Sequence, residues 1–174
     1  ASEPRIVAGL AQIALIRADE TWLHLRLLPE KAPAARELLT SQLQQRLAKA
    51  KTTMKAVAPL AKDDKSRASS EIILHIDYLR LQDKAADARK RAALLENKGA
   101  DAGRALASLD LMEERYDPQS VAARLREAVR SEQKLGRAQA LLVYALARSG
   151  DKETAKSDLE RFATAHPTHP LLSA

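Results

Sequence analysis

The chain of 174 residues has the length of one ordinary domain, with 45% hydrophobic residues, 3% aromatic residues and a net charge of +6. It contains no Cys, which excludes a disulfide framework, a thiolate nucleophile and a Cys-ligated metal site. No apolar run reaches the roughly 18 residues of a membrane-spanning helix. Strong helix formers dominate, and small Ala and Leu side chains suit closely packed helices, so we expect an all-α protein.

The positive charge is concentrated in residues 31–67, which carry nine basic and three acidic side chains, whereas the rest of the chain is balanced. This segment is either a solvated helix face or a docking face for an acidic protein, nucleic acid or anionic lipid. Nucleic acid fits least, because no aromatic residues alternate with the basic ones to stack on bases. The candidate basic patch consists of Arg46, Lys49, Lys51 and Lys55.

The first predicted element is a helix over residues 4–28, with a short turn or cap in the segment RADETW around Asp19. The apolar run 6–16 has the length of a signal-peptide core, but charged residues follow it directly and no cleavage site is present. We therefore interpret it as part of a buried first helix. A start without an initiator Met indicates a processed or excised chain, which a signal or anchor segment could have preceded.

A second, long amphipathic helix is predicted over residues 33–58. Its apolar stripe comprises Leu39, Leu43, Leu47, Ala50, Met54 and Val57. Pro59 should stop or kink this helix near Ala58, and the polar segment 62–70 is interpreted as the main internal linker.

The remaining chain predicts six shorter helices, at about 69–81, 84–97, 102–115, 118–132, 137–148 and 152–165. Asp83, Asp117 and Asp151 lie in the breaks within successive pairs and are each 34 residues apart. Each Asp can cap the following helix by accepting hydrogen bonds from its exposed N–H groups. Gly150 can adopt the left-handed conformation that ends a helix. Because one pair cannot cover its own apolar face, such pairs are expected to stack.

Residues 137–170 carry the pattern best, through Leu142, Val143, Leu146, Gly150, Asp151, Ala155, Leu159, Phe162 and Pro167. With its 34-residue period, the chain resembles the tetratricopeptide repeat (TPR) family. The resemblance covers about 69–170 and implies a right-handed solenoid of three helix pairs, at about 69–97, 102–132 and 137–165. In this division, residues 1–62 form N-terminal helices that are a diverged repeat or a cap, 63–170 form the repeats, and 171–174 are a tail.

The resemblance further implies a concave groove, lined by the first helix of each pair, that holds a partner peptide or helix. Carried over by position, the groove residues are Arg80, Asp110, Glu113, Glu114, Arg137, Tyr144 and Arg148. Tyr144 would act as a rigid anchor beside an acidic patch flanked by Arg.

No catalytic chemistry is predicted. The segment HPTHP at 166–170 offers only two His ligands, fewer than the usual three or four, so we expect no metal site. Glu113 and Glu114 are adjacent and diverge by about 100° on a helix, which makes a poor acid–base pair. Nucleophile–base arrangements and phosphate-binding loops are also missing, so neither an enzyme nor a cofactor is expected.

The favoured hypothesis is a noncatalytic scaffold or adaptor that binds a protein or peptide through the concave groove. A first alternative is a protein that binds polyanions or an anionic membrane surface through residues 31–67. A second is a structural subunit that self-assembles into homo-oligomers. The sequence leaves both a cytoplasmic and an exported location open, and it leaves open any membrane attachment through a further segment.

Overall fold

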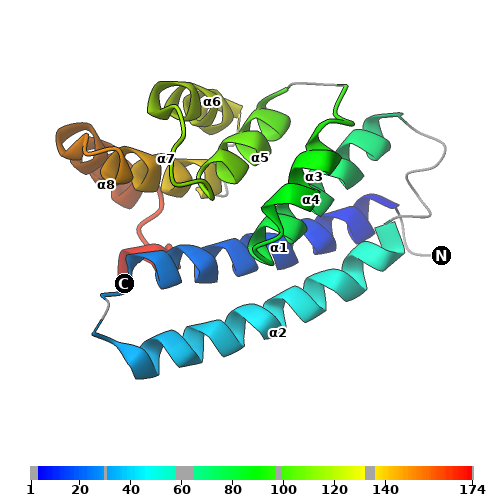
Figure 1. Ribbon diagram of the computed structural model, residues 1–174, viewed down its shortest axis with the longest axis horizontal. Helices are drawn as coiled ribbons and strands as arrows, with labels where there is room; N and C mark the ends of the chain where they lie inside the picture. The colour runs from blue at the N-terminus through cyan, green and yellow to red at the C-terminus, as the bar shows by residue number, and fades with distance from the viewer. Residues whose placement is uncertain (1–3, 30, 58–64, 97–98, 132–135, 174) are drawn as a thin grey trace. The chain divides into compact units, whose positions relative to one another are not determined.

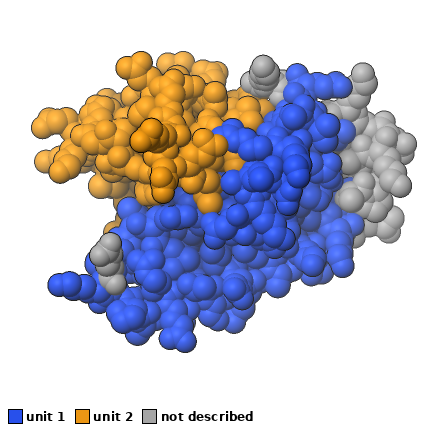
Figure 2. Space-filling model, viewed as in Figure 1, with its two compact units in different colours: residues 1–97 blue, residues 98–174 orange. Residues whose placement is uncertain are grey.

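The computed structural model describes residues 4–29, 31–57, 65–96, 99–131 and 136–173. In these ranges the chain forms eight α-helices, one short 3-10 helix and no strand, which confirms the all-α class (Figure 1). It divides into two compact units, unit 1 with residues 1–97 and unit 2 with residues 98–174 (Figure 2). The first predicted helix pair therefore belongs to the same compact unit as the N-terminal helices, whereas the sequence had suggested a division near residue 62.

Unit 1 begins with two long helices, α1 (Pro4–Leu27) and α2 (Pro33–Val57), which lie side by side in antiparallel directions (Figure 1). Both predicted helices are confirmed. The predicted turn around Asp19 is wrong, since α1 continues through it without a break. The physical reason is that the Asp19 carboxylate is buried in an ion pair with Arg80 rather than used to cap a helix end.

The apolar first half of α1 is buried on one side only. Ala11, Leu15 and Ala18 are fully covered, whereas three large apolar residues on another face are about half exposed: Ile6, Leu10 and Ile13. The expectation of a buried first helix is therefore only partly right. A helix that is apolar all round can bury only the side that its neighbours α2 and α3 cover.

Helices α3 (Lys65–Leu81) and α4 (Ala85–Ala92) complete unit 1 and pack against each other. Because α3 begins at Lys65, the linker prediction is wrong for residues 65–70, while residues 62–64 and the predicted stop at Pro59 lie outside the described residues. Helix α4 ends at Ala92, earlier than predicted, as the chain tightens into turns: the Leu94 N–H donates to the Arg91 carbonyl at 3.0 Å.

The turn between α3 and α4 is a Schellman motif. The Lys84 N–H donates to the Leu79 carbonyl at 3.0 Å, and the Asp83 N–H donates to the Arg80 carbonyl at 2.9 Å. Asp83 has a left-handed backbone with φ of 57°, and the N-cap position belongs to Lys84. The prediction that Asp83 caps α4 is therefore wrong. Asp83 is instead the left-handed residue of the turn that ends α3.

Unit 2 contains α5 (Ala100–Asp110), α6 (Pro118–Ser131), α7 (Arg137–Arg148) and α8 (Lys152–Ala165), followed by the 3-10 helix η2 (Pro170–Ser173). Consecutive helices pack on each other: α5 on α6, α6 on α7 and α7 on α8. The predictions of α7 and α8 are confirmed at both ends and α6 is confirmed to residue 131. Helix α5 stops five residues before the predicted end at 115, because residues 111–117 form a loop with its own contacts, described below.

The turn between α7 and α8 repeats the Schellman motif, with the Asp151 N–H donating to the Leu146 carbonyl at 3.1 Å. Gly150 has a φ of 85°, as predicted, and the Asp151 carboxylate caps α8 by accepting from the Thr154 N–H at 3.2 Å. Asp117 plays a similar role before α6, since its carboxylate accepts from the Gln119 N–H at 3.0 Å. Capping is thus confirmed at two of the three predicted Asp residues.

Candidate functional site

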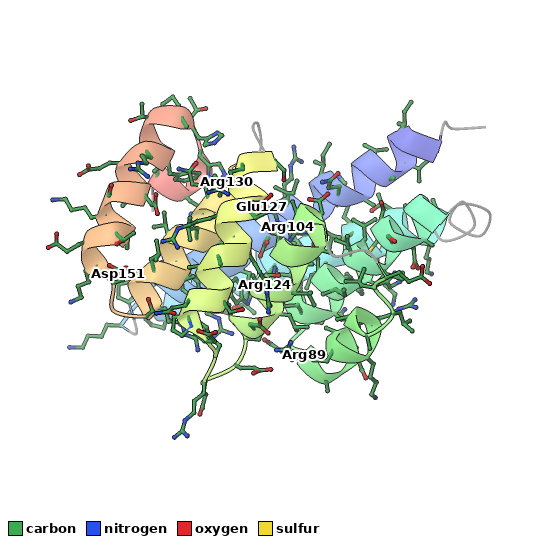
Figure 3. The ribbon with its side chains drawn as sticks, turned by 90° about the horizontal axis from the view of Figure 1, so that it is seen from above. Arg89, Arg104, Arg124, Glu127, Arg130 and Asp151 are labelled. Carbon is green, nitrogen blue, oxygen red and sulfur yellow. The ribbon has the colours of Figure 1, made fainter. Side chains whose placement is uncertain are left out.

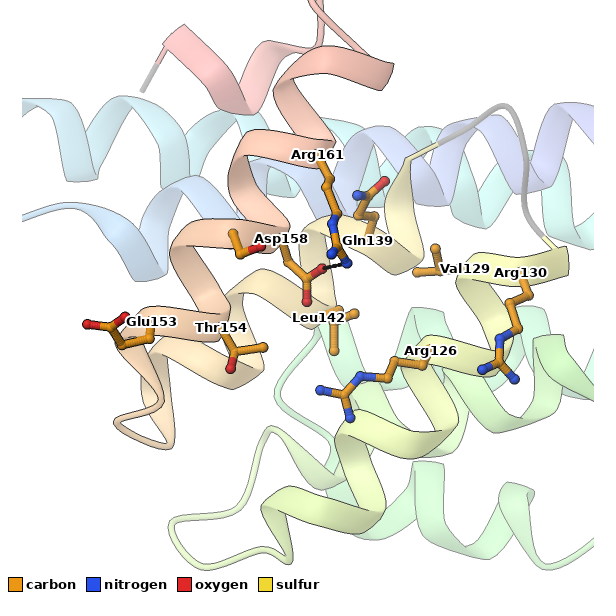
Figure 4. Close-up of a pocket in the computed structure, with 10 residues that line it drawn as sticks. Arg126, Val129, Arg130, Gln139, Leu142, Glu153, Thr154, Asp158 and Arg161 are labelled. Atoms are coloured by element: carbon orange, nitrogen blue, oxygen red, sulfur yellow. Dashed lines mark hydrogen bonds and ion pairs between the residues drawn. The ribbon is translucent and has the colours of Figure 1, made fainter.

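Unit 2 has a groove whose two walls are α6 and α8 and whose floor is α7 (Figure 4). Its volume is about 510 Å³, in the range of sites that bind small ligands or side chains. Helix α6 turns Val121, Leu125 and Ala128 inward, and its residues Arg126 and Arg130 line the groove. The lining residues are Arg126, Val129 and Arg130 from α6, Gln139 and Leu142 from α7, and Glu153, Thr154, Ser157, Asp158 and Arg161 from α8.

The α6 wall is basic. Arg126 and Arg130 are four residues apart, so both side chains project from the same face of the helix. Arg130 forms an ion pair with Glu127 at 3.2 Å, and both side chains are mostly exposed (Figure 3). Within the described residues, Arg126 makes neither a hydrogen bond nor an ion pair. The α6 wall therefore offers one uncommitted guanidinium and one that is held only by an exposed ion pair.

The α8 wall is mixed in charge. Asp158 is only 8% exposed, and its carboxylate forms an ion pair with Arg161 at 3.4 Å (Figure 4). Glu153 and Thr154 lie at the other end of this wall. Because the Asp158 charge is balanced by Arg161, the cations of the α6 wall dominate the central part of the groove.

Guanidinium groups recognise carboxylates and phosphates through paired N–H donors. The groove also contains the hydroxyl groups of Thr154 and Ser157, but no His stands among its described lining residues to activate them. The arginines and hydroxyl groups therefore give the groove hydrogen-bond donors that can bind an anionic group.

None of the groove residues expected from the TPR resemblance lines this groove. Arg148 instead holds the loop 111–117: it donates to the Leu111 carbonyl and, at 2.6 Å, to the Glu113 carbonyl. Its guanidinium also lies 4.9 Å from the ring centroid of Tyr116. Arg148 thus fastens the end of α7 to the loop that follows α5.

The other predicted residues of unit 2 are dispersed. The Asp110 carboxylate accepts from Arg124 at 2.7 Å, which ties α5 to α6. Glu113 and Glu114 are exposed in the loop, and Tyr144 is half-buried. Arg137 is only 5% exposed, so it is not part of an open surface.

In unit 1, Arg80 was expected in the groove but lies in the interior, with no exposed surface. It forms an ion pair with Asp19, and its guanidinium stacks over Trp22 at 4.9 Å from the ring centroid. As a fully buried side chain, Arg80 is not available to a partner.

The predicted basic patch on α2 is divided. Arg46 donates to the Arg17 carbonyl and, at 2.7 Å, to the Thr21 hydroxyl, which pins α2 to α1. Lys49, Lys51 and Lys55 are exposed. Lys51 and Lys55 are one turn apart on one face, whereas Lys49 lies about 160° around the helix from Lys51.

The sequence pattern did not lead us to predict Arg126 and Arg130 as binding residues. One signal was present, since Arg126 and Arg130 share a face opposite the inward Leu125 and Ala128. Arg161 and Asp158, however, join them only through the packing of α8 on α7, which no local pattern reports.

The two His residues of the HPTHP segment pack around a core residue. The rings of His166 and His169 lie 5.4 and 4.8 Å from that of Phe162, measured between centroids. Over the described part of the chain there is no group of three or more His, Cys, Asp or Glu residues placed to hold a metal ion. The helices there include none that is long and apolar enough to cross a membrane.

Comparison with known proteins gives no match for this chain among protein families, curated proteins or solved structures. The functional argument therefore depends on the groove itself.

Proposed function

We propose that this chain is a noncatalytic protein-interaction module that holds an acidic segment of a partner protein in the groove between α6 and α8. The observation that carries the proposal is the basic α6 wall, with Arg126 and Arg130 facing a groove of about 510 Å³. The repeat organisation expected from the TPR resemblance supports it, because stacked helix pairs present extended binding surfaces. The consecutive packing of α5 to α8 is consistent with such stacking.

An acidic segment is favoured by the state of the arginines. An exposed ion pair such as Arg130–Glu127 contributes only about 0–1 kcal/mol, so exchanging Glu127 for a carboxylate of the partner costs little. Among the described residues Arg126 forms no ion pair that a partner's carboxylate would have to replace. Alternate side chains of an extended segment are about 6.7 Å apart, close to the spacing of two arginines one helical turn apart.

The test is selection of binding peptides from a random peptide library displayed on phage, panned against the full chain. Selected peptides are then titrated into three proteins: the wild type, Arg126→Glu/Arg130→Glu, and the control Arg115→Glu/Lys156→Glu. The control makes the same charge change at exposed residues of unit 2 outside the groove lining.

We expect peptides enriched in Asp and Glu, with affinity reduced at least about tenfold in the groove variant and little changed in the control. Affinity should also fall as salt is raised. If the selected peptides bind the groove variant as tightly as the wild type, the groove is not the binding site and the proposal fails.

A further inference from the structure

A second surface, in unit 1 and independent of the groove, is the exposed apolar stripe of α1, formed by Ile6, Leu10 and Ile13. Their exposed fractions are 56%, 53% and 48%, although the opposite side of the same helix is fully buried. The spacing of four and three residues places all three side chains on one face of the helix, in line with the exposed Arg17. Contiguous apolar surface of this kind marks an interaction site more often than single exposed residues do.

The surroundings of the stripe are cationic. Residues 4–57, which span α1 and α2, carry nine basic and four acidic side chains, a net charge of +5. One of those acids, Asp19, is neutralised in the interior by Arg80 and contributes nothing to the surface. From residue 4 to residue 18 the sequence contains no acidic residue at all.

Helix α2 adds a cation on the side of α1 that bears the stripe. Arg46 reaches the backbone carbonyl of Arg17, at the end of the stripe, and so fixes which edge of α2 lies against α1. Lys49, three residues further on, lies close to the same edge and is exposed. As α2 runs antiparallel to α1, the chain from Arg46 to Lys49 advances from Arg17 toward the stripe.

We propose that the α1–α2 hairpin binds the surface of an anionic lipid bilayer, with Ile6, Leu10 and Ile13 inserted among the lipids. Arg17 and Lys49 then lie against the negatively charged headgroups. Apolar side chains on one helix face combined with flanking cations are what peripheral membrane binding requires. A second copy of this chain fits the surface less well, because two hairpins of charge +5 repel each other.

The test is sedimentation of the full chain with lipid vesicles, composed either of phosphatidylcholine alone or of phosphatidylcholine and phosphatidylglycerol in equal parts. Three variants are compared with the wild type. Leu10→Ser/Ile13→Ser removes the stripe, Arg17→Gln/Lys49→Gln removes the cations, and Leu94→Ser/Leu159→Ser is the control. The control makes the same chemical change at exposed apolar residues outside the hairpin. Circular dichroism checks that each variant is folded, as expected for substitutions at exposed positions.

We expect binding to the anionic vesicles that falls by about tenfold or more in the stripe variant, because two apolar side chains no longer insert. The charge variant should lose affinity for anionic vesicles, and the control should bind like the wild type. Absence of binding to anionic vesicles, or equal binding by the stripe variant, overturns the proposal. Ultracentrifugation that detects a dimer abolished by Leu10→Ser/Ile13→Ser also overturns it, since a second copy then occupies the stripe.

Discussion

Arg80 and Asp19 form an ion pair in the interior of unit 1, although 61 residues separate them in the sequence. The pair joins α3 to α1, and both side chains are almost completely buried, at 0% and 1% exposed. The Trp22 ring covers one face of the guanidinium. The contact thus fixes how α3 lies on the long N-terminal helix by a polar interaction as well as by apolar packing.

Removal of one member of this pair should strongly destabilise unit 1. We expect Asp19→Ala to lower the free energy of unfolding by about 3–5 kcal/mol, because the buried Arg80 charge loses its partner. Urea denaturation followed by Trp22 fluorescence measures the change. The double variant Asp19→Leu/Arg80→Met is the control, since replacing both charges by apolar groups is often neutral or stabilising. A loss below about 1 kcal/mol in the single variant would contradict the structural role of the pair.

The cap of α8 gives a smaller, local prediction. Asp151→Ala should lower the free energy of unfolding by about 1 kcal/mol, because the Thr154 N–H loses its hydrogen bond. Asp151→Asn should be close to the wild type, since the Asn side-chain oxygen accepts the same bond. Thermal unfolding of the three proteins in parallel separates the outcomes, and equal stability of the Ala and Asn variants would show that the cap is not formed.

Gly150 and Gly136 both have left-handed backbones. Substituting each one separates the stability cost of backbone strain from the cost of a steric clash. Gly150 has open space where a Cβ atom would lie, whereas a Cβ at Gly136 would meet Phe162 Cε2 at 2.9 Å and His166 Cδ2 at 3.1 Å. Gly150→Ala should therefore cost about 1 kcal/mol, from backbone strain alone. Gly136→Ala should cost about 1–3 kcal/mol more, because Phe162 in the core has to move. Equal losses in urea denaturation would mean that the close approach at Gly136 is absent.

The elements that the sequence predicted best are those governed by local chemistry. Helices α7 and α8 were placed correctly at both ends, because Gly150 and Asp151 end one helix and begin the next through short-range hydrogen bonds. The 34-residue alignment matched Asp83 with Asp151. The two Schellman turns instead match Asp83 with Gly150, since each adopts the left-handed conformation. The two left-handed positions are therefore one residue closer together in the sequence than the aligned Asp residues, and the role expected of Asp83 was wrong.

Two residues that were expected in the partner-binding groove are held by partners distant in the sequence. Arg80 was expected on a surface and lies in the interior, because Asp19 neutralises it from another helix. Arg148 was expected to face a partner, yet it binds backbone carbonyls of the loop after α5, more than 30 residues away. Arg126 and Arg130 could be recognised as one basic face of α6, but the opposite wall of their groove depends on how α8 packs. Helical periodicity reports which side of a helix is buried and not which helix covers it.

Tyr116 leads to a prediction for alkaline pH. Burial raises the pKa of its hydroxyl above 10.0, an effect that the Arg148 charge partly offsets and Tyr144 reinforces. Well below pH 10 both the folded and the unfolded chain keep this proton, and the contribution of Tyr116 to stability is complete. As the pH rises from 10 through the folded-state pKa, the unfolded chain loses the proton first, so the free energy of unfolding should fall. Urea denaturation at a series of alkaline pH values measures this loss, and Tyr116→Phe should reduce it.

The role of Arg148 in that titration can be tested separately by the ultraviolet absorbance of tyrosinate. Arg148→Gln removes the positive charge that lies 4.9 Å from the Tyr116 ring, so the pKa of Tyr116 should rise further. Arg148→Lys keeps a positive charge and should leave the pKa nearer its wild-type position, although it makes fewer hydrogen bonds to the loop. The difference between wild type and Tyr116→Phe isolates this tyrosine from Tyr78 and Tyr144. A Tyr116 that titrates at the ordinary value in the wild type, or at a lower pH in Arg148→Gln, would mean that Arg148 does not fasten the loop 111–117 over the end of α7.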